Sequence, residues 1–276
     1  MNTLPVDSIP EPVLFLLKKL ERAHHRAFVV GGAVRDTCLG RPVIDWDLAT
    51  SASVRSIQSI FRDTPRYTLG HATVAVIVGG RPYEITPFRG WTNTLKEDLA
   101  HRDLTINAMA LDPETRQIID LHNGHRDLRD KVIRAVENPD DRFREDPLRL
   151  LRAIRFAAQF DFKIHKDTSS AISENASLLS NAAPERIREE LMKILMVQKP
   201  SGYFNTLATT GLLKTFIPEL LEGRLKRQNR YHRYTIFKHI LKTVDYVKPD
   251  PLLRVTALFH DIAKPRIRAK IEGTWR

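Results

Sequence analysis

The spacing of apolar residues changes near residue 110, and this change constrains the fold more than any other feature of the chain. Before that point, segments with the apolar spacing of helices alternate with short apolar runs that are typical of strands. After it, long segments repeat with the helical period and are separated by Asn-Pro, Ala-Pro and Lys-Pro pairs at positions 138, 183 and 199. The sequence therefore predicts an α+β head followed by an α-helical body.

The composition limits the class of protein. The chain has 276 residues, of which 42% are hydrophobic and 28% are charged, so it can bury a core and form two or more domains. Its formal net charge of +11 indicates an anionic partner such as nucleic acid. A single cysteine, Cys38, excludes an internal disulfide framework, and the lack of a long apolar run or a secretory leader favours a cytoplasmic protein without a membrane segment.

Turn residues outline the elements of the head. Residues 10–25 have the spacing of an amphipathic helix, and residues 27–30 read as a buried strand that runs into Gly31 and Gly32. A second strand is predicted over 43–50. Apolar and polar residues then alternate on both sides of Gly79 and Gly80, which predicts a hairpin.

Two aspartates in the second predicted strand form a candidate metal site. Side chains alternate along a strand, so Asp45 and Asp47 project from one face and Trp46 from the other. Two carboxylates so close repel each other unless a cation lies between them, and Mg²⁺ prefers oxygen ligands and accompanies substrate phosphates. The alternative is that both aspartates are simply solvated at a strand end.

The segment before these aspartates has the features of a phosphate site. Gly31 and Gly32 stand between a predicted strand and a predicted helix, where backbone N–H groups and the positive helix end can face a phosphate. Arg35 adds a bidentate donor for phosphate oxygens. The segment contains neither a P-loop nor a Rossmann glycine pattern. Together with the aspartates, it predicts a site for a nucleoside triphosphate and its metal.

Residues 145–160 predict a helix with two different faces. Apolar side chains gather on one face, and Arg149, Arg152 and Arg155 occupy the other. The nearest acidic residues, Glu145 and Asp146, stand at the amino end, where the helix dipole favours them. A solvated surface is the alternative interpretation of the three arginines.

Four motifs occur in one order along the chain: GGAVRD at 31–36, DWD at 45–47, RDLTINAMA at 102–110 and EDPLRLLRAIRF at 145–156. In this order they resemble the class II tRNA nucleotidyltransferase and poly(A) polymerase family. The resemblance implies a head with a mixed sheet and helices like that of DNA polymerase beta, followed by an all-α neck and body. It also implies transfer of C or A from CTP or ATP to the 3′ end of tRNA, without a template and with Mg²⁺, releasing pyrophosphate.

The resemblance also implies a division of the chain into four parts. These are a nucleotidyltransferase head at 1–110, a neck with a base-reading helix at 111–165, an RNA-binding helical body at 166–222 and a further helical segment at 223–276. The oligomeric state is left open.

Roles for individual residues follow from the motif matches. The expected metal ligands are Asp45 and Asp47. Glu84 is a candidate third carboxylate that helps to activate the RNA hydroxyl. The alternative, which is the commoner case for a glutamate in a strand, is that Glu84 simply faces solvent. The resemblance implies further nucleotide contacts at Gly32, Arg35, Arg102, Asp103, Asp146, Arg149, Arg152 and Arg155.

The resemblance implies that Asp146 and Arg149 read the base, and hydrogen-bond chemistry explains why this pair suits the task. Arginine only donates and an ionised aspartate only accepts, which suits the amino group and ring nitrogen that cytosine and adenine both present. For Arg152 and Arg155, which border the nucleotide in the resembling family, a salt bridge to the body is the alternative.

The segment GWTNTLKEDLA at 90–100 differs from many CCA-adding relatives, which carry a longer flexible loop at this point. Family members without that loop tend to add only the two cytidines. We therefore expect CC addition, with CCA addition and poly(A) polymerase activity as alternatives that share the same motifs.

The last segment resembles the start of an HD domain. YHRYTIFKHILKTV at 231–244 and ALFHDIAKP at 257–265 supply His239, His260 and Asp261 as candidate metal ligands. The HD pattern needs a further aspartate downstream, and none follows, so we expect the sequence to be a fragment. A phosphohydrolase or RNA-binding protein with an inactive transferase head is the alternative function.

Overall fold

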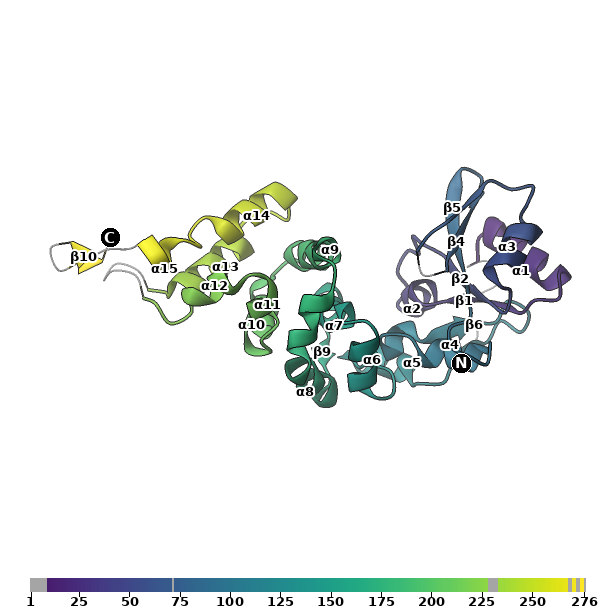
Figure 1. The fold of residues 1–276 in the computed structure, drawn as a ribbon, viewed down its shortest axis with the longest axis horizontal. Helices are drawn as coiled ribbons and strands as arrows, with labels where there is room; N and C mark the ends of the chain where they lie inside the picture. Colours follow the sequence, from purple (N-terminus) through teal and green to yellow (C-terminus); the bar gives the residue numbers. More distant parts are fainter. Residues whose placement is uncertain (1–8, 71, 228–232, 268–269, 272–273, 276) are drawn as a thin grey trace. The chain divides into compact units, whose positions relative to one another are not determined.

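The computed structural model describes residues 9–70, 72–227, 233–267, 270–271 and 274–275. Its contacts divide the chain into two compact units, which are drawn in sequence colours in Figure 1. The first unit, the head, ends at Asp130 and also includes Arg134–Glu137. The second, the helical unit, contains Lys131–Ile133 and the chain from Asn138 onward.

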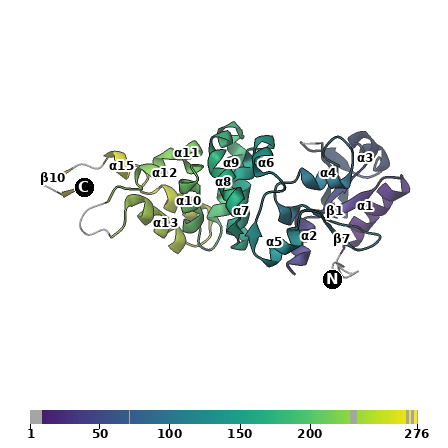
Figure 2. The same cartoon turned by 90° about the horizontal axis from the view of Figure 1, so that it is seen from below.

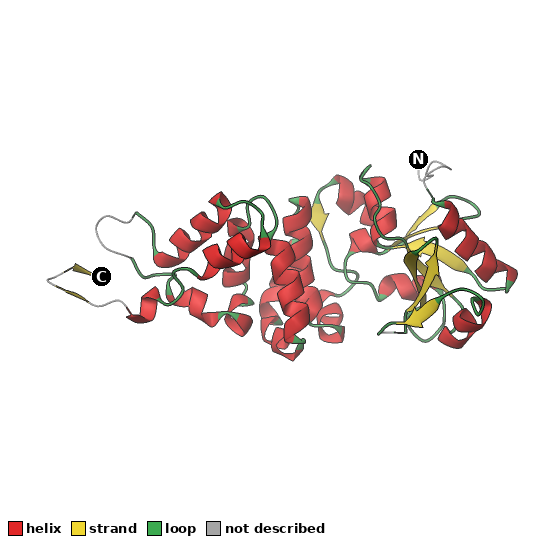
Figure 3. Ribbon diagram, turned by 90° about the horizontal axis from the view of Figure 1, so that it is seen from above, coloured by secondary structure: helices red, strands yellow, loops and turns green. Residues whose placement is uncertain are grey.

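A seven-stranded sheet forms the centre of the head, and its strands are yellow in Figure 3. The strand order is β3-β4-β5-β2-β1-β6-β7, with β2 and β5 parallel and the other neighbours antiparallel. The strands are β1 (Ala27–Val30), β2 (Asp47–Thr50), β3 (Arg66–Thr68), β4 (Val74–Val78), β5 (Arg81–Pro87), β6 (Met109–Leu111) and β7 (Ile118–Asp120). The predicted hairpin at Gly79 and Gly80 is confirmed, because β4 and β5 pair across it.

Short helices surround this sheet: α1 (Glu11–Arg22), α2 (Gly32–Cys38), α3 (Val54–Ile60), α4 (Leu95–Ala100), the 3₁₀ helix η2 (Thr105–Asn107) and α5 (Gly124–Arg129). On one face of the sheet, Phe28, Val30 and Ala49 pack with Leu95 and Leu99 of α4 in a buried cluster. Because Val30 pairs with Asp47 and Phe28 pairs with Ala49, the face that carries this core also carries Asp47.

Two boundaries differ from the sequence prediction. The expected end of the head at residue 110 was wrong, because β7 pairs with β6 and continues the same sheet beyond it. Arg134 also belongs to the head, since its guanidinium binds Asp127, which accepts a hydrogen bond from Thr105. The strand expected from residue 43 begins only at Asp47, although Trp46 is already buried.

The helical unit is almost wholly α-helical, as the spacing of apolar residues predicts. Its helices are α6 (Pro139–Glu145), α7 (Leu148–Phe160), α8 (Lys166–Glu174), the 3₁₀ helix η3 (Ala176–Asn181), α9 (Pro184–Leu195), α10 (Ser201–Thr209), α11 (Leu213–Phe216), α12 (Pro218–Glu222), α13 (Ile236–Tyr246), α14 (Pro251–Phe259) and α15 (Lys264–Ile267). Two short strand pairs complete it: β8 (Val132–Ile133) with β9 (Lys163–Ile164), and β10 (Lys270–Ile271) with β11 (Thr274–Trp275).

Helix α7 is central to this unit and packs against α9 (Figure 2). Leu150, Leu151 and Ile154 of α7 are fully buried, as expected for its apolar face. Among the described residues, no helix is both long and apolar enough to cross a lipid bilayer.

Candidate functional site

The head carries three candidate carboxylates, one in β2, one just before β2 and one in β5. Asp47 is the first residue of β2, and Asp45 precedes it by two positions. The parallel strands β2 and β5 pair Leu48 with Ile85, so Asp47 and Glu84, the residues just before this pair, lie on one face of the sheet. Asp45 is exposed and Trp46 is buried, but both precede β2, so the expected projection of Asp45 and Asp47 from one strand face stays a prediction.

Burial and neighbouring charges raise the pKa values of two of these carboxylates. Burial, opposed by the charge of Arg102 and reinforced by that of Asp45, raises the pKa of Asp47 above its ordinary value. Burial also raises the pKa of Glu84, and the charges of Asp47 and Asp45 raise it further. The charge of Asp45 therefore disfavours ionisation of Asp47, and the charges of both aspartates disfavour ionisation of Glu84.

Gly31 allows the backbone to approach these carboxylates closely. It has a φ of +72°, which a residue with a β-carbon rarely adopts. A β-carbon at this position would lie 3.0 Å from Arg102 Nη1 and 4.0 Å from Asp47 Oδ2. Gly31 thus leaves open the space between a guanidinium and a carboxylate, at the point where β1 passes into α2.

Arg35 on α2 is held in place by two partners. Asp36 accepts from Nε at 2.9 Å and from Nη2 at 2.8 Å, and Asn107 Oδ1 accepts from Nη1 at 2.6 Å. The Arg35 side chain is 8% exposed, and its Nη2 would lie 3.5 Å from a β-carbon at Gly32. The guanidinium is therefore fixed beside the glycine turn by its planar contacts.

Sequence reasoning did not identify two residues that position this site. Asn107 lies within the RDLTINAMA motif and links Arg35 to Asp103, whose Oδ1 accepts from Asn107 Nδ2 at 3.1 Å. Asp98 is fully buried and accepts from Arg102 Nε at 3.0 Å and Nη2 at 2.9 Å. The sequence signal available for Asp98 was its position four residues before Arg102, the first residue of the RDLTINAMA motif.

The donor set of the head fits a magnesium ion. Asp45 and Asp47 supply carboxylate oxygens, the ligand type that Mg²⁺ prefers. Burial, together with the charges of neighbouring carboxylates, raises the pKa values of Asp47 and Glu84, and a bound cation would offset this cost of ionisation.

In the helical unit, Asp146 and Arg149 are anchored at the start of α7. Asp146 Oδ1 accepts from the backbone N–H of Leu148 at 3.1 Å, and its Oδ2 accepts from Arg186 Nη2 at 3.1 Å. Arg149 Nη1 donates to Glu145 Oε2 at 2.8 Å. No acidic residue lies among Arg149, Arg152 and Arg155 in the sequence. The acidic partner of Arg149 is instead Glu145, the last residue of α6.

The other two predicted nucleotide contacts on α7 differ in their surroundings. Arg155 is 7% exposed, donates from Nε to Glu190 Oε2 of α9 at 2.7 Å and stacks on Phe156, with 3.4 Å from Cζ to the ring centroid. The alternative of a salt bridge to the body describes this geometry, and a nucleotide contact by Arg155 stays a prediction. Arg152 is half-buried, with its guanidinium 5.4 Å from the same ring centroid.

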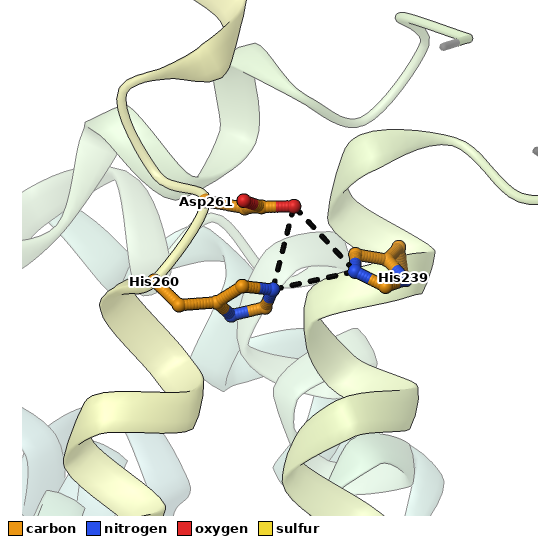
Figure 4. Close-up of side chains that lie close together, drawn as sticks. All are labelled: His239, His260 and Asp261. Atoms are coloured by element: carbon orange, nitrogen blue, oxygen red, sulfur yellow. Dashed lines mark hydrogen bonds and ion pairs between the residues drawn. The ribbon is translucent and has the colours of Figure 1, made fainter. Parts of the chain in front are cut away.

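A second cluster of metal-ligand residues lies in the helical unit (Figure 4). His239 on α13 and the pair His260 and Asp261, which follow α14, bring two Nε2 atoms and one Oδ2 atom together. Within the described residues, this is the group of histidine, cysteine and acidic side chains whose ligand atoms all lie within 4.8 Å of one another.

Two family models match the chain, one in each unit. The Poly A polymerase head domain matches residues 27–134. The domain described as the probable RNA and SrmB-binding site of polymerase A matches residues 161–223.

Curated relatives are CCA-adding enzymes. The chain is 42% identical over 226 residues to the CCA-adding enzyme of Ligilactobacillus salivarius, covering 76% of this chain and 56% of the relative. It is 44% identical over 211 residues to that of Pediococcus pentosaceus, covering 71% and 53%. The chain thus spans about half the length of the curated relatives it matches.

Solved structures agree with both results. The Bacillus stearothermophilus CCA-adding enzyme in complex with CTP matches with a TM-score of 0.72 and 33% identity, over 93% of this chain and 69% of that one. A tRNA nucleotidyltransferase complexed with a primer tRNA and an incoming ATP analog matches with a TM-score of 0.68 and 26% identity, over 89% and 75%. The chain therefore belongs to the family of tRNA nucleotidyltransferases and poly(A) polymerases that includes the CCA-adding enzymes.

Proposed function

We propose that the chain is a template-independent tRNA nucleotidyltransferase that adds cytidine from CTP to the tRNA 3′ end and releases pyrophosphate. The observation that carries this proposal is the position of Gly31, where a β-carbon would lie 3.0 Å from Arg102 Nη1 and 4.0 Å from Asp47 Oδ2, beside a strand register that puts Glu84 on the same face of the sheet as Asp47. The same fold is present in a CCA-adding enzyme in complex with CTP. The substrates, tRNA and ribonucleoside triphosphates, make the cytoplasm the proposed location.

Asp45 and Asp47 would hold Mg²⁺, which when bound neutralises charge on the triphosphate. Arg35 and Arg102 bind phosphate oxygens, and both are fixed in advance by their partners Asp36, Asn107 and Asp98. Gly32, next to Arg35, leaves room for the triphosphate chain.

Glu84 accepts the proton of the attacking hydroxyl. The 3′ oxygen of the RNA forms a bond to the α-phosphorus, the bond from that phosphorus to the bridging oxygen breaks, and pyrophosphate leaves. A carboxylate whose pKa is raised is a better base near neutral pH than an ordinary one, which suits Glu84 to this role.

Asp146 and Arg149 choose the base. Asp146 accepts from the amino group of cytosine or adenine, and Arg149 donates to the adjacent ring nitrogen. Arg186 holds Asp146 and Glu145 holds Arg149, so both side chains are oriented before a nucleotide binds. Arg152 and Arg155 lie further along the same helix, where Arg155 joins α7 to Glu190 of α9, and Asp103 supports Arg35 through Asn107.

The segment at 90–100 supports cytidine addition as the main activity. Residues 90–94 close onto the start of α4, where the Glu97 carboxylate accepts from the backbone N–H groups of Trp91 at 2.8 Å and Thr92 at 2.5 Å. The hydroxyl of Thr92 also donates to Glu97 and, with these backbone contacts, lowers the pKa of that carboxyl. A closed turn at this point leaves little chain to move when the incoming base changes from C to A.

Incubation with tRNA ending at its discriminator base tests this function. We expect cytidine incorporation with CTP, and gel analysis with CTP and ATP together distinguishes CC from CCA ends. Long adenosine tails with ATP alone would instead show a poly(A) polymerase. A variant with Asp45→Ala and Asp47→Ala is the control, and incorporation that this variant retains would contradict the proposed site.

A second function is favoured by one observation, the triangle formed by His239, His260 and Asp261. Its sides are 3.3 Å between the two Nε2 atoms, 3.5 Å from His239 Nε2 to Asp261 Oδ2 and 3.3 Å from His260 Nε2 to the same oxygen. A tetrahedral metal with bonds of about 2.1 Å has its ligands about 3.4 Å apart. We therefore propose that this cluster binds a transition metal such as Zn²⁺.

The orientation of His260 supports this second proposal. Its Nδ1 lies 2.8 Å from the carbonyl oxygen of Ala257, which can only accept, so Nδ1 carries the proton in this contact. In the neutral ring Nε2 then presents its lone pair to the cluster, the arrangement common for metal-binding histidines.

A further inference from the structure

Lys264 contacts the oxygen that both histidines of the cluster face. Its Nζ donates to Asp261 Oδ2 at 2.7 Å, and the same oxygen forms two sides of the triangle with His239 and His260. The Asp261 side chain is 9% exposed, whereas that of Lys264 is 43% exposed. The ammonium group of Lys264 therefore occupies a position beside Asp261 Oδ2 that a bound metal ion would use.

The chain keeps this ammonium close to the cluster. Lys264 begins α15, and its backbone N–H donates to the carbonyl of Asp261 at 3.1 Å, which closes a turn between the two residues. The ion pair joins residues three apart, so the effective concentration of the ammonium at the carboxylate is high.

We propose that Lys264 is a tethered competitor that lowers the affinity of the His239–His260–Asp261 cluster for divalent metal. This inference rests on the metal site proposed above. An incoming ion must displace the ammonium from Oδ2 or bind beside it. Displacement loses the ion pair, and binding beside it places two like charges close together. Because Lys264 is half exposed, it can turn into solvent, and the cluster remains able to load.

The competition raises the concentration of free metal at which the cluster is half filled. Its ligands are preformed, as the side lengths of the triangle show, so little ordering is needed when the ion arrives. The affinity is then governed by the charge of Lys264 and not by rearrangement of His239 or His260.

Metal titration of the full chain tests this inference. The substitutions Asp45→Asn and Asp47→Asn are made in every sample, so that the carboxylate pair of the head does not contribute. Zn²⁺ binding is measured by calorimetry, and Co²⁺ by its visible absorption, which reports four-coordinate geometry. Lys264→Gln removes the charge and keeps a hydrogen-bond donor, while Lys242→Gln removes the same charge from an exposed position on α13.

We expect Lys264→Gln to bind Zn²⁺ about tenfold more tightly than the parent chain, and Lys242→Gln to bind as the parent does. His239→Ala should lose this binding while keeping the circular dichroism spectrum of the parent. Equal affinity in Lys264→Gln and the parent would overturn the role of Lys264 and leave the metal site standing. Binding that is the same with and without His239, or absent in all samples, would overturn the metal site and the competition together, while cytidine transfer by the wild-type head would be unaffected.

Discussion

Arg35 and Asn107 are 72 positions apart in the sequence and are joined by a buried hydrogen bond of 2.6 Å from Nη1 to Oδ1. Asn107 in turn donates to Asp103, which is itself buried and accepts from the backbone N–H of Leu104. The RDLTINAMA segment therefore acts on the proposed triphosphate site by holding Arg35.

Asn107→Ala should weaken CTP binding. The guanidinium of Arg35 loses one of its planar contacts, so we expect the KM for CTP to rise about tenfold with a smaller change in kcat. The buried donor left behind should lower the free energy of unfolding by about 1–3 kcal/mol. Steady-state kinetics and urea denaturation measure the two effects. Asn205→Ala, an amide lost from the surface of α10, is the control, and an unchanged KM in Asn107→Ala would contradict this role.

Asp47→Asn should abolish transfer. It removes one proposed metal ligand with little change in volume, and we expect kcat to fall about 10³-fold. Incorporation of radiolabelled CMP into tRNA measures the loss. Asp63→Asn, an exposed carboxylate after α3, is the control and should transfer at the wild-type rate.

Asp47→Asn should also stabilise the metal-free protein, and the size of this effect should depend on pH. The pKa values of Asp47 and Glu84 are raised in the folded state, so their contribution to stability is complete below the unfolded values of 3.8 and 4.5 and is lost as the pH rises through the folded ones. At pH 7 without metal, Asp47→Asn should therefore be more stable than wild type by about 1 kcal/mol, and the difference should shrink toward pH 4.

Thermal melting across this pH range, with and without Mg²⁺, measures the effect. Because Mg²⁺ binds the ionised carboxylates, it should raise the melting temperature of wild type more than that of Asp47→Asn. A difference between the two proteins that grows as the pH falls would have the wrong sign for this explanation.

Arg186→Ala should relax the choice of base. It frees the Asp146 carboxylate from its partner, and we expect discrimination between CTP and UTP to fall about 10–100-fold, the range for loss of a well-formed contact to a base edge. The ratio of kcat/KM for the two nucleotides is the measurement. Arg144→Ala, an exposed arginine of α6, is the control. Equal effects of the two substitutions would mean that only general charge is involved.

Glu190→Ala should destabilise the helical unit. It leaves the buried guanidinium of Arg155 without its ion-pair partner, which costs about 3–5 kcal/mol. Arg155→Met in the same chain should recover part of that loss, because no unpaired charge remains. Denaturant unfolding of both single variants and the double variant measures the coupling. If Arg155→Met alone keeps normal KM values for CTP, the role of Arg155 is to join α7 and α9.

Much of this protein could be predicted from patterns within a few residues. The helical period of residues 148–160 and the hairpin at Gly79 and Gly80 both appear in the structure. These features depend on near neighbours, because side-chain period and turn conformation are local properties of the backbone. The order of the motifs was sufficient to identify the family.

Only the tertiary structure decided which distant residues meet. The pairing of β2 with β5 places Glu84 beside Asp47, and the fold brings Asn107 to Arg35 and Glu190 to Arg155. It also extended the head past residue 110, because β7 completes the sheet. Strand pairing and helix packing depend on contacts between segments far apart in the chain. The spacing of residues within one segment does not specify which other segment it contacts.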